Sequence, residues 1–367
     1  MTALSNFSLP RIDYRSQSFL RTVDAQLTGV SMGRVTMKDV ADAAGVSLKT
    51  VSRVLNNEPY VTDDIRTLVR KAAQKLNYRP SAVARALAGK RSNQIALLYD
   101  NPSPYYAYEV QMGALERCRE DGFRLIFHPC DANSPDLEHS VIDLVEENHI
   151  EGLILTPPIS DNQDLVKALG DRAIALVLIA PGRRVPDVAA VTMDDYAASF
   201  AMTEYLIGLG HREIGFISGP SSHQAARNRL YGYRRALDAN GIAEDDSLVV
   251  PGTFDYTSGR VACAALLDGD RKPSAIFASN DDMAAGAMAV AHERGIGIPA
   301  DLSIAGFDDT NLAQMVWPPL TTVHQPVRDL ASIAAEILIS REKLRDASTR
   351  TVDFEIMRRQ STAIRQK

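Results

Sequence analysis

The sequence contains no run of uncharged apolar residues approaching the roughly 18 that a membrane span requires, and its mean hydropathy is −0.13. The first 21 residues include three arginines and no apolar segment, so a secretory signal is not expected. Cysteine is scarce: Cys118, Cys130 and Cys263 are odd in number and widely spaced, which fits neither a disulfide framework nor a zinc site. These absences exclude a transmembrane protein and favour one that stays in a reducing cytoplasm.

The motifs of common enzyme classes are also missing. The chain has no P-loop, no H-E-x-x-H and no G-x-S-x-G, and its seven histidines show no metal-ligand spacing. The carboxylate pairs Asp281–Asp282 and Asp308–Asp309 could suggest glycoside hydrolysis or a metal site, but adjacent residues at a strand end usually point in different directions. We therefore expect a protein that is not an enzyme and uses no metal or cofactor.

Charge is unevenly distributed along the 367 residues, a length that suggests two or three domains. Residues 35–91 contain eleven Lys and Arg against five Asp and Glu, a net charge of +6, and residues 1–34 carry +2. Because the whole chain has a formal net charge of −6, residues 92–367 carry −14. A basic segment joined to an acidic body predicts binding of a polyanion at one end. The alternative is a solvated basic face, which charge counting alone does not exclude.

The basic segment shows the signals of three short helices. Thr36 and Asp39 resemble a capping box, so the first helix should begin near Met37, and Gly45 offers the left-handed backbone that ends it. Ser47 can cap a second helix that runs to about Leu55. A third helix is expected over residues 63–76, capped by Thr62 and buried through Ile65, Leu68, Val69 and Ala72. Such a unit is typical of a helix-turn-helix, whose second helix enters the major groove of DNA.

The string VTMKDVADAAGVSLKTVSRVLN and its continuation to about Asp100 resemble, without a gap, the N-terminal signature of the lactose-repressor (LacI/GalR) family of bacterial transcription factors. Later segments resemble the family in the same order, namely YLIGLGHREIGFISGP, FASNDDMAAGAM, LSIAGFDDT and PPLTTVHQP. The resemblance covers everything except residues 1–34. It implies a helix-turn-helix DNA-binding domain with a hinge helix, followed by a two-lobed, periplasmic-binding-protein-like (type I) α/β body.

Within the basic segment the resemblance implies roles for individual positions. Leu48, Lys49 and Arg53 would read bases, and the Arg53 guanidinium suits the O6 and N7 atoms of guanine. Phosphates would be held by short hydroxyl and amide side chains, those of Ser47, Thr50, Ser52 and Asn56. Plain helix capping is the alternative for Ser47 and Thr50, and a solvated side chain is the alternative for Lys49.

Residues 81–91 follow Pro80 and form a short, alanine-rich segment that should be marginal as an isolated helix. In the family this segment is the hinge helix, which folds when two copies meet in the minor groove. The resemblance implies that Leu87, with Ala84, is the wedge that enters the central base step and kinks the duplex. The alternative is an ordinary linker with Leu87 packed on the body.

From Gln94 onward, short apolar segments alternate with helical ones. This pattern indicates parallel sheets covered on both faces, and the number of strands favours two α/β lobes. Helices are expected over about 196–209 and 330–338, and a last strand over about 351–357. The other strands are expected over residues 95–100, 124–130, 152–158, 174–180, 188–194, 213–220, 248–254, 275–281 and 302–309.

The resemblance also implies how the domains divide. The chain would cross between the lobes near Val191, Pro319 and Val352. The body, residues 92–360, would then consist of one lobe formed by 92–191 with 320–351 and another formed by 192–319 with 352–360. It would follow the helix-turn-helix domain (35–80) and the hinge helix (81–91). Residues 1–34 are expected to be a disordered extension or to reflect a start codon called too early.

A ligand is expected in the cleft between the lobes, where loops leave the carboxyl ends of the strands. Arg229, Asn280 and Asp308 match effector contacts of the family, and their donors and acceptors suit a polyhydroxylated ligand. Phe254, together with Tyr105 or Tyr106, would stack on the apolar face of a sugar. Helix capping is the alternative for Asn280 and Asp308, and a core position for Phe254. Ala180 stands where some sugar-binding members carry Asp, which leaves the ligand open.

The prediction for function is a repressor of carbohydrate-use genes that binds a palindromic operator in double-stranded DNA. A small-molecule effector, a sugar, would release it or tighten its binding. A homodimer is expected because a palindrome needs two heads and no heptad tail follows to make a tetramer. The first alternative, a solute-binding protein that delivers a sugar to a transporter, lacks an export signal. The second, a sugar-processing enzyme, would have to turn over its ligand.

Overall fold

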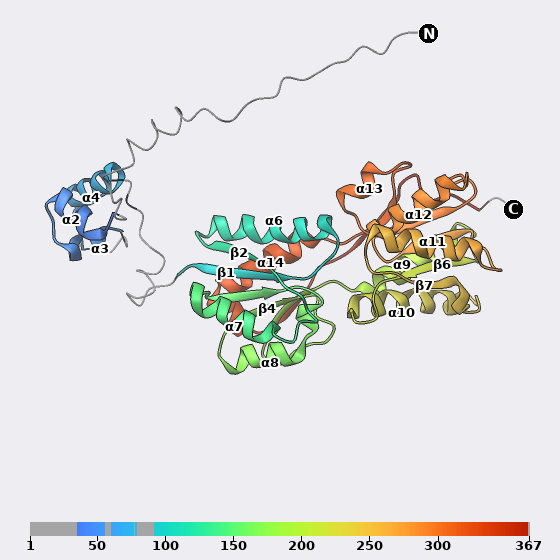
Figure 1. The fold of residues 1–367 in the computed structure, drawn as a ribbon, viewed down its shortest axis with the longest axis horizontal. Helices are drawn as coiled ribbons and strands as arrows, with labels where there is room; N and C mark the ends of the chain where they lie inside the picture. The colour runs from blue at the N-terminus through green and yellow to red at the C-terminus, as the bar shows by residue number, and fades with distance from the viewer. Residues whose placement is uncertain (1–34, 56–59, 77, 79–91, 366–367) are drawn as a thin grey trace, which may run out of the picture. The chain divides into compact units, whose positions relative to one another are not determined.

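The computed structural model describes residues 35–55, 60–76, 78 and 92–365 (Figure 1). The chain separates into two compact units, Met1–Arg85 and Ala86–Lys367. The expectations for residues 1–34, for the hinge segment 81–91 with Ala84 and Leu87, and for Asn56 lie outside the described residues. No helix of the described part is long and apolar enough to cross a membrane.

The first unit contains three helices, α2 (Met37–Ala44), α3 (Leu48–Leu55) and α4 (Asp63–Lys75). Thr36 and Asp39 form the predicted capping box, and Gly45 has the predicted left-handed conformation at φ 64°. The Ser47 hydroxyl accepts a hydrogen bond from the Thr50 amide at 3.1 Å, which caps α3. All three helices contribute small apolar residues to one core: Val40, Ala41, Ala44, Val51, Val54, Val69, Ala72 and Ala73.

Two expectations for α4 were wrong. Leu68 is 48% exposed, because Val69, Ala72 and Ala73 form the buried face of α4 and Leu68 lies at the edge of that face. Thr62 occupies the position before the helix, but its side chain makes no capping hydrogen bond. Asp63 and Asp64 in the first turn instead interact favourably with the positive end of the helix dipole.

The second unit consists of two α/β lobes. The sheet of the first lobe has the order β11-β5-β4-β3-β1-β2, and all its neighbouring strands are parallel. Its strands are β1 (Gln94–Tyr99), β2 (Arg124–Pro129), β3 (Gly152–Leu155), β4 (Ala175–Ile179), β5 (Ala189–Thr192) and β11 (Thr349–Thr351). The associated helices are α6 (Pro104–Glu120), α7 (Leu137–Asn148), the 3-10 turn η1 (Ile159–Asp161), α8 (Gln163–Asp171), α14 (Val327–Ile339) and α15 (Arg341–Arg345).

The strand alternation of the first lobe explains its layers. Ile95 and Leu97 on β1 belong to the core on the side of α6 and α14, whereas Ala96 and Leu98 belong to the core on the side of α7 and α8 (Figure 1). Successive side chains of a strand point to opposite faces, so an uninterrupted apolar strand must be covered on both.

The sheet of the second lobe has the order β12-β10-β9-β8-β6-β7, and β12 alone is antiparallel to its neighbour. Its strands are β6 (Ile214–Ser218), β7 (Val249–Pro251), β8 (Ala275–Ala278), β9 (Ser303–Asp308), β10 (Thr321–His324) and β12 (Glu355–Met357). The associated helices are α9 (Asp195–Gly208), α10 (Gln224–Ala239), the turn η2 (Asp246–Leu248), α11 (Tyr256–Asp268), α12 (Asp281–Glu293) and α13 (Asn311–Met315). Phe216, Phe277 and Phe307 pack under α9 and α10.

The chain crosses between the lobes three times, and two details differ from the expectation. Strand β10 pairs with β9, so the second crossing lies between His324 and Val327 and not near Pro319. The single strand expected over 351–357 is two strands, β11 beside β5 in the first lobe and β12 beside β10 in the second. Two strands separated by only a few residues join different sheets here, and their pairing partners decide the sheet to which each belongs.

Candidate functional site

The first turn of α3 presents two of the three candidate base-reading residues to solvent. Leu48 is 51% exposed, and its neighbours Ser47 and Lys49 are exposed as well. Because successive residues of a helix are about 100° apart, Leu48, Lys49, Ser52 and Arg53 share the face opposite the buried valines. About half of this leucine side chain is exposed to water in the free protein, which fits a contact surface.

The candidate phosphate contacts are partly engaged within the head itself. The hydroxyls of Ser47 and Thr50 lie 2.8 Å apart, and Ser47 caps α3, so the capping interpretation of Ser47 holds in the free protein. Ser52 and Arg53 are half-buried and interact with other residues. Arg53 lies in the last turn of α3, where a cation is also favourable to the helix dipole. Contacts of these side chains with DNA remain predictions.

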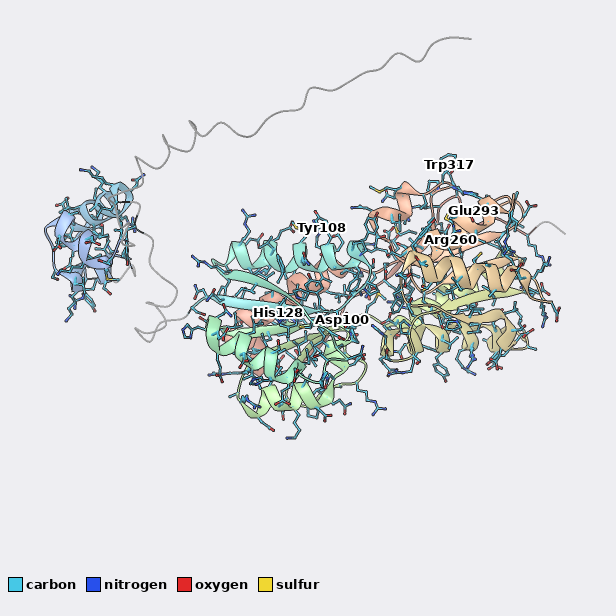
Figure 2. All side chains as sticks on the ribbon, in the orientation of Figure 1. Asp100, Tyr108, His128, Arg260, Glu293 and Trp317 are labelled. Carbon is cyan, nitrogen blue, oxygen red and sulfur yellow. The ribbon has the colours of Figure 1, made fainter. Side chains whose placement is uncertain are left out.

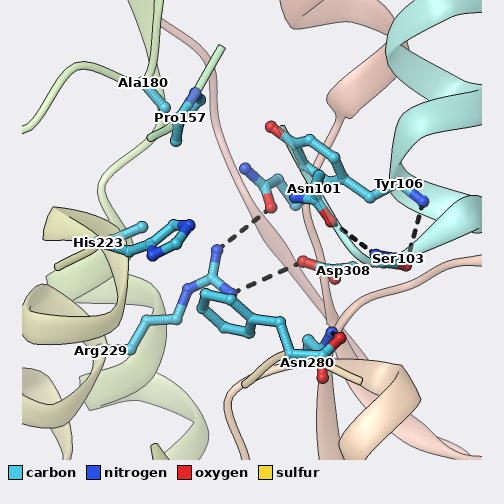
Figure 3. A pocket seen from close by; sticks show the side chains of 12 residues that line it. Asn101, Ser103, Tyr106, Pro157, Ala180, His223, Arg229, Asn280 and Asp308 are labelled. Carbon is cyan, nitrogen blue, oxygen red and sulfur yellow. Dashed lines mark hydrogen bonds and ion pairs between the residues drawn. The ribbon is translucent and has the colours of Figure 1, made fainter. Parts of the chain in front are cut away.

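In the body, polar side chains converge on a cleft between the two lobes (Figure 3). The empty space of this cleft is about 440 Å³ when the open solvent at its mouth is included. Most of its lining residues follow the carboxyl ends of strands in both sheets. They are Asn101, Ser103, Tyr106, Pro157, Ala180, His223, Ala225, Arg229, Phe254, Asn280, Asp308 and Gln325.

Arg229 on α10 is the most heavily bonded side chain of the cleft. Its Nε donates to Asp195 Oδ1 at 2.7 Å, its Nη1 donates to the carbonyl of Ser279 at 2.6 Å, and its Nη2 donates to Gln325 Oε1 at 3.3 Å. The guanidinium lies over the ring of Phe307 at 3.6 Å from its centroid. These contacts hold the guanidinium in one orientation, which is how a protein prepares a donor for a ligand.

Asp308, the last residue of β9, lies 3.7 Å from Arg229 Nη1. Burial raises the pKa of the Asp308 carboxyl well above its usual range, although the positive charge of Arg229 opposes the shift. Burial likewise raises the pKa of the Asp195 carboxyl, and the positive charge of Arg229 again opposes the shift. Asp308 has a positive φ of 111°, an uncommon backbone conformation that turns the chain sharply at the cleft.

Asn280 and Phe254 both line the cleft and both have structural roles. The Asn280 side chain caps α12 by accepting from the Met283 amide at 2.9 Å, and its Nδ2 donates to the Phe254 carbonyl at 2.9 Å. Phe254 has a φ of 61°, and its ring covers Gly219, where any Cβ would come within 2.2 Å of the ring. The capping alternative for Asn280 is therefore confirmed without removing the residue from the cleft.

The structure places Tyr106, and not Tyr105, in the cleft. Adjacent residues on α6 point about 100° apart, so only one of the two tyrosines can face the ligand space. The cleft also contains Asn101, His223 and Gln325, which were not among the residues predicted from the sequence. Each follows a strand directly or within a short loop, so a search restricted to strand ends would have found Gln325 once β10 had been recognised as a strand.

Direct contacts join the two lobes beside the cleft. The Ser103 hydroxyl, which caps α6, donates to Asp282 Oδ2 at 2.5 Å. On the other flank, Asp161 accepts hydrogen bonds from the amides of Gly182 at 2.6 Å and Gln224 at 3.2 Å. A Cβ on Gly182 would lie 2.2 Å from Gln224, so this close approach of the lobes requires glycine.

The adjacent carboxylate pairs do not form paired catalytic groups. Asp281 accepts from Thr322 and Thr310 inside the second lobe, whereas Asp282 accepts from Ser103 across the cleft. Burial raises the pKa of Asp281 to about 7. Asp308 faces Arg229, whereas Asp309 pairs with His324 at 3.0 Å and with Arg359. Each pair therefore points in two directions, as the sequence predicts.

Comparisons with known proteins agree with this arrangement. The family described as "Bacterial regulatory proteins, lacI family" matches residues 36–81, and the "Periplasmic binding protein-like domain" matches residues 203–362. The HTH-type transcriptional regulator DegA of Bacillus subtilis is 36% identical over 302 residues, which are 82% of this chain and 89% of DegA. The chain belongs to the LacI family. It is a DNA-binding transcriptional repressor with an effector domain, and its relatives are regulators, not enzymes.

Further relatives cover nearly the whole chain. The repressor PurR of Proteus mirabilis is 35% identical and covers 89% of this LacI-family chain and 97% of its own length. The structure of the lac repressor dimer bound to operator and the anti-inducer ONPF has a TM-score of 0.80 and 27% identity, and it covers 90% of this chain and all of its own. A solute-binding protein, the alternative function, does not account for the matched DNA-binding head.

Proposed function

We propose that this LacI-family repressor is controlled by a polyhydroxylated small molecule, a sugar, bound in the interlobe cleft. The arrangement of Arg229 and Asp308 supports this proposal, because a buried guanidinium and a buried carboxyl offer a donor and an acceptor to neighbouring hydroxyl groups. Asn280 adds an amide, and Phe254 and Tyr106 add aromatic surface of the kind that covers the apolar face of a sugar. A solved regulator complex with cellobiose and the ribose operon repressors are among its relatives.

In the proposed DNA complex each α3 enters the major groove of one half-site. Leu48, Lys49 and Arg53 read bases there, and the phosphates are held by Ser47, Thr50, Ser52 and Asn56. Paired hinge helices carry Leu87 and Ala84 into the central minor groove. Since effector and operator bind the same protein, linkage requires each to change the affinity for the other by the same factor.

Operator binding is tested with the purified full chain and a library of palindromic and random duplexes in a fluorescence-anisotropy titration. We expect a palindrome to bind more tightly than random DNA, with an affinity that falls steeply as salt rises because Lys and Arg release counterions. Equal affinity for all duplexes would contradict the proposal. Addition of the effector should then shift the operator affinity in one direction.

Replacing Leu87 with alanine tests the proposed wedge. The variant should bind the operator about tenfold more weakly and bend it less, because alanine cannot fill the opened base step. The bend angle is measured by fluorescence resonance energy transfer between the ends of a labelled operator. An unchanged bend angle would assign Leu87 to a linker packed on the body.

We propose that the homodimer forms through one side of the body. Exposed apolar side chains lie there on both lobes, Tyr108 on α6 and Met315 and Trp317 at α13, and Figure 2 shows Tyr108 and Trp317 on the same side. Trp317 is 74% exposed, and a large apolar side chain in contact with water is unfavourable unless a partner covers it. The operator-bound dimer among the similar structures supports a second copy of this chain as the partner.

Trp317→Ala should raise the dimer dissociation constant at least about tenfold, because buried tryptophans dominate interface energies. Sedimentation equilibrium measures this constant, and operator affinity should fall with it. Tyr231→Ala is the matched control, since Tyr231 is an exposed aromatic on α10. Equal effects of the two substitutions, or no effect of either, would place the interface elsewhere.

A further inference from the structure

A second polar hollow lies beside the effector cleft, and we call it the annex. Its lining includes Ser160, Asp161, Gly182, Arg183, Gln224 and Arg227, and its empty space is about 480 Å³ when the open solvent at its mouth is included. The same three segments border both spaces: the loop after β3, the loop after β4 and the start of α10. The annex and the cleft are therefore neighbouring spaces along these three segments.

Unpartnered buried polar atoms gather around these two spaces. Within the described residues, four buried side-chain nitrogen or oxygen atoms have no hydrogen-bond partner. Two of them line the spaces, namely Ser160 Oγ in the annex and His223 Nε2 in the cleft, where Figure 3 shows the His223 ring. Ser160 is only 2% exposed. A buried hydroxyl without a partner is unfavourable, and an acceptor atom of a ligand would remove that cost.

The charge of the annex favours an anion. Arg183 and Arg227 both line it, and neither forms an ion pair with a described residue. The Arg227 guanidinium is held by neutral acceptors, Gln224 Oε1 and the carbonyl of Ser221. Asp161 is the acid of the annex, and its carboxylate is already occupied by two backbone amides. The start of α10 adds the positive end of a helix dipole, and of its amides that of Gln224 already donates to Asp161.

We propose that the effector is a phosphorylated sugar, with its polyol in the cleft and its phosphate monoester in the annex. This inference rests on the proposed function and deepens it. A phosphate offers three acceptor oxygens, which match the Ser160 hydroxyl and the planar forks of Arg183 and Arg227. Near pH 7 the ester carries a charge of about −1.5 to −2, so it also balances the two arginines.

Isothermal titration calorimetry of the full chain tests the proposal with matched pairs. The probes are glucose, fructose and ribose, the monophosphate ester of each, and inorganic phosphate. At least one ester should bind about tenfold or more tightly than its parent sugar. In the Arg183→Gln/Arg227→Gln variant this preference should disappear while the affinity for the parent sugar is unchanged. Ser160→Ala should weaken the preference by a smaller factor.

Arg184→Gln is the matched control, because Arg184 is the exposed neighbour of Arg183 and lines a different hollow. It should leave the preference intact. If no ester binds better than its sugar, or if the double variant keeps the preference, the inference is wrong. Inorganic phosphate that binds as tightly as the best ester would show that free phosphate is the ligand. The proposed function is tested separately. It is wrong if the protein shows no preference for a palindromic operator, or if none of these ligands changes the operator affinity.

Discussion

Replacing Arg229 with methionine is expected to lower the free energy of unfolding of the body by about 3–5 kcal/mol and to abolish effector binding. The side chain is buried, bonded to Asp195 at 2.7 Å and paired with Asp308 at 3.7 Å. Methionine fills a similar volume but leaves two buried carboxyl groups without their cation. Urea denaturation followed by circular dichroism measures the loss, and calorimetry measures effector binding.

The loss of stability in Arg229→Met should grow as pH rises. Burial raises the pKa of both Asp195 and Asp308, and the charge of Arg229 opposes this. An acid whose pKa is higher in the folded than in the unfolded state binds more protons when folded, so its contribution to stability is present at low pH and is lost as pH rises through the folded pKa. Without Arg229 both pKa values rise further, so the deficit should be larger at pH 8 than at pH 5.

Arg229→Lys is the control for charge. It keeps a cation beside the carboxyl groups but loses the planar fork, so it should recover most of the stability and little of the effector affinity. A deficit that does not change with pH would mean that Arg229 stabilises the lobe mainly through its contact with the Phe307 ring. Operator binding by the separate N-terminal head should persist in both variants.

Arg53→Ala is expected to weaken operator binding by about 1–3 kcal/mol and to relax base preference at one position in each half-site. Arg53 is the basic residue of the last turn of α3 and lies on the same face as Leu48 and Lys49. A guanidinium that forks to guanine distinguishes that base from the other three, and alanine cannot. Titrations against operators with single base changes measure the loss of preference.

The control for Arg53→Ala is Lys71→Ala, which removes one positive charge from an exposed position of α4. It should weaken binding equally for all sequences, if at all, without changing base preference. Should Arg53→Ala also weaken binding uniformly and lower the Tm of the head, its role would be structural, through the helix dipole and the contacts it makes within the protein.

Sequence signals that span only a few residues predicted much of the fold. Thr36, Asp39 and Gly45 set the ends of α2 through hydrogen bonds and backbone conformations that span only a few residues, and the structure shows all three as expected. The strands β1 to β9 were recognisable as apolar segments, and in fully buried strands such as β3, β6 and β8 both faces must be apolar. The missed strand β10 has the sequence TTVH, with a single large apolar residue among polar ones.

Contacts between segments far apart in the sequence decided the features that these local signals did not predict. Leu68 has an apolar side chain at helical spacing, yet the small residues Ala72 and Ala73 face the core instead. Tyr105 and Tyr106 are chemically identical, and only the rotation of α6 about its axis, set by its packing on α14 and the first sheet, selects Tyr106. The hydrogen bond from Ser103 to Asp282 joins residues 179 positions apart, and no sequence pattern around either residue predicts it.

The sequence by itself determined the helix-turn-helix head, its basic charge and the alternation of strands and helices in the body, because these depend on neighbours a few residues apart. Tertiary structure decided which short strand joins which sheet, which polar groups meet between the lobes, and that an unpartnered serine and two arginines lie together beside the cleft. The reason is physical: pairing, burial and charge balance depend on distances between segments that only the packed chain brings together.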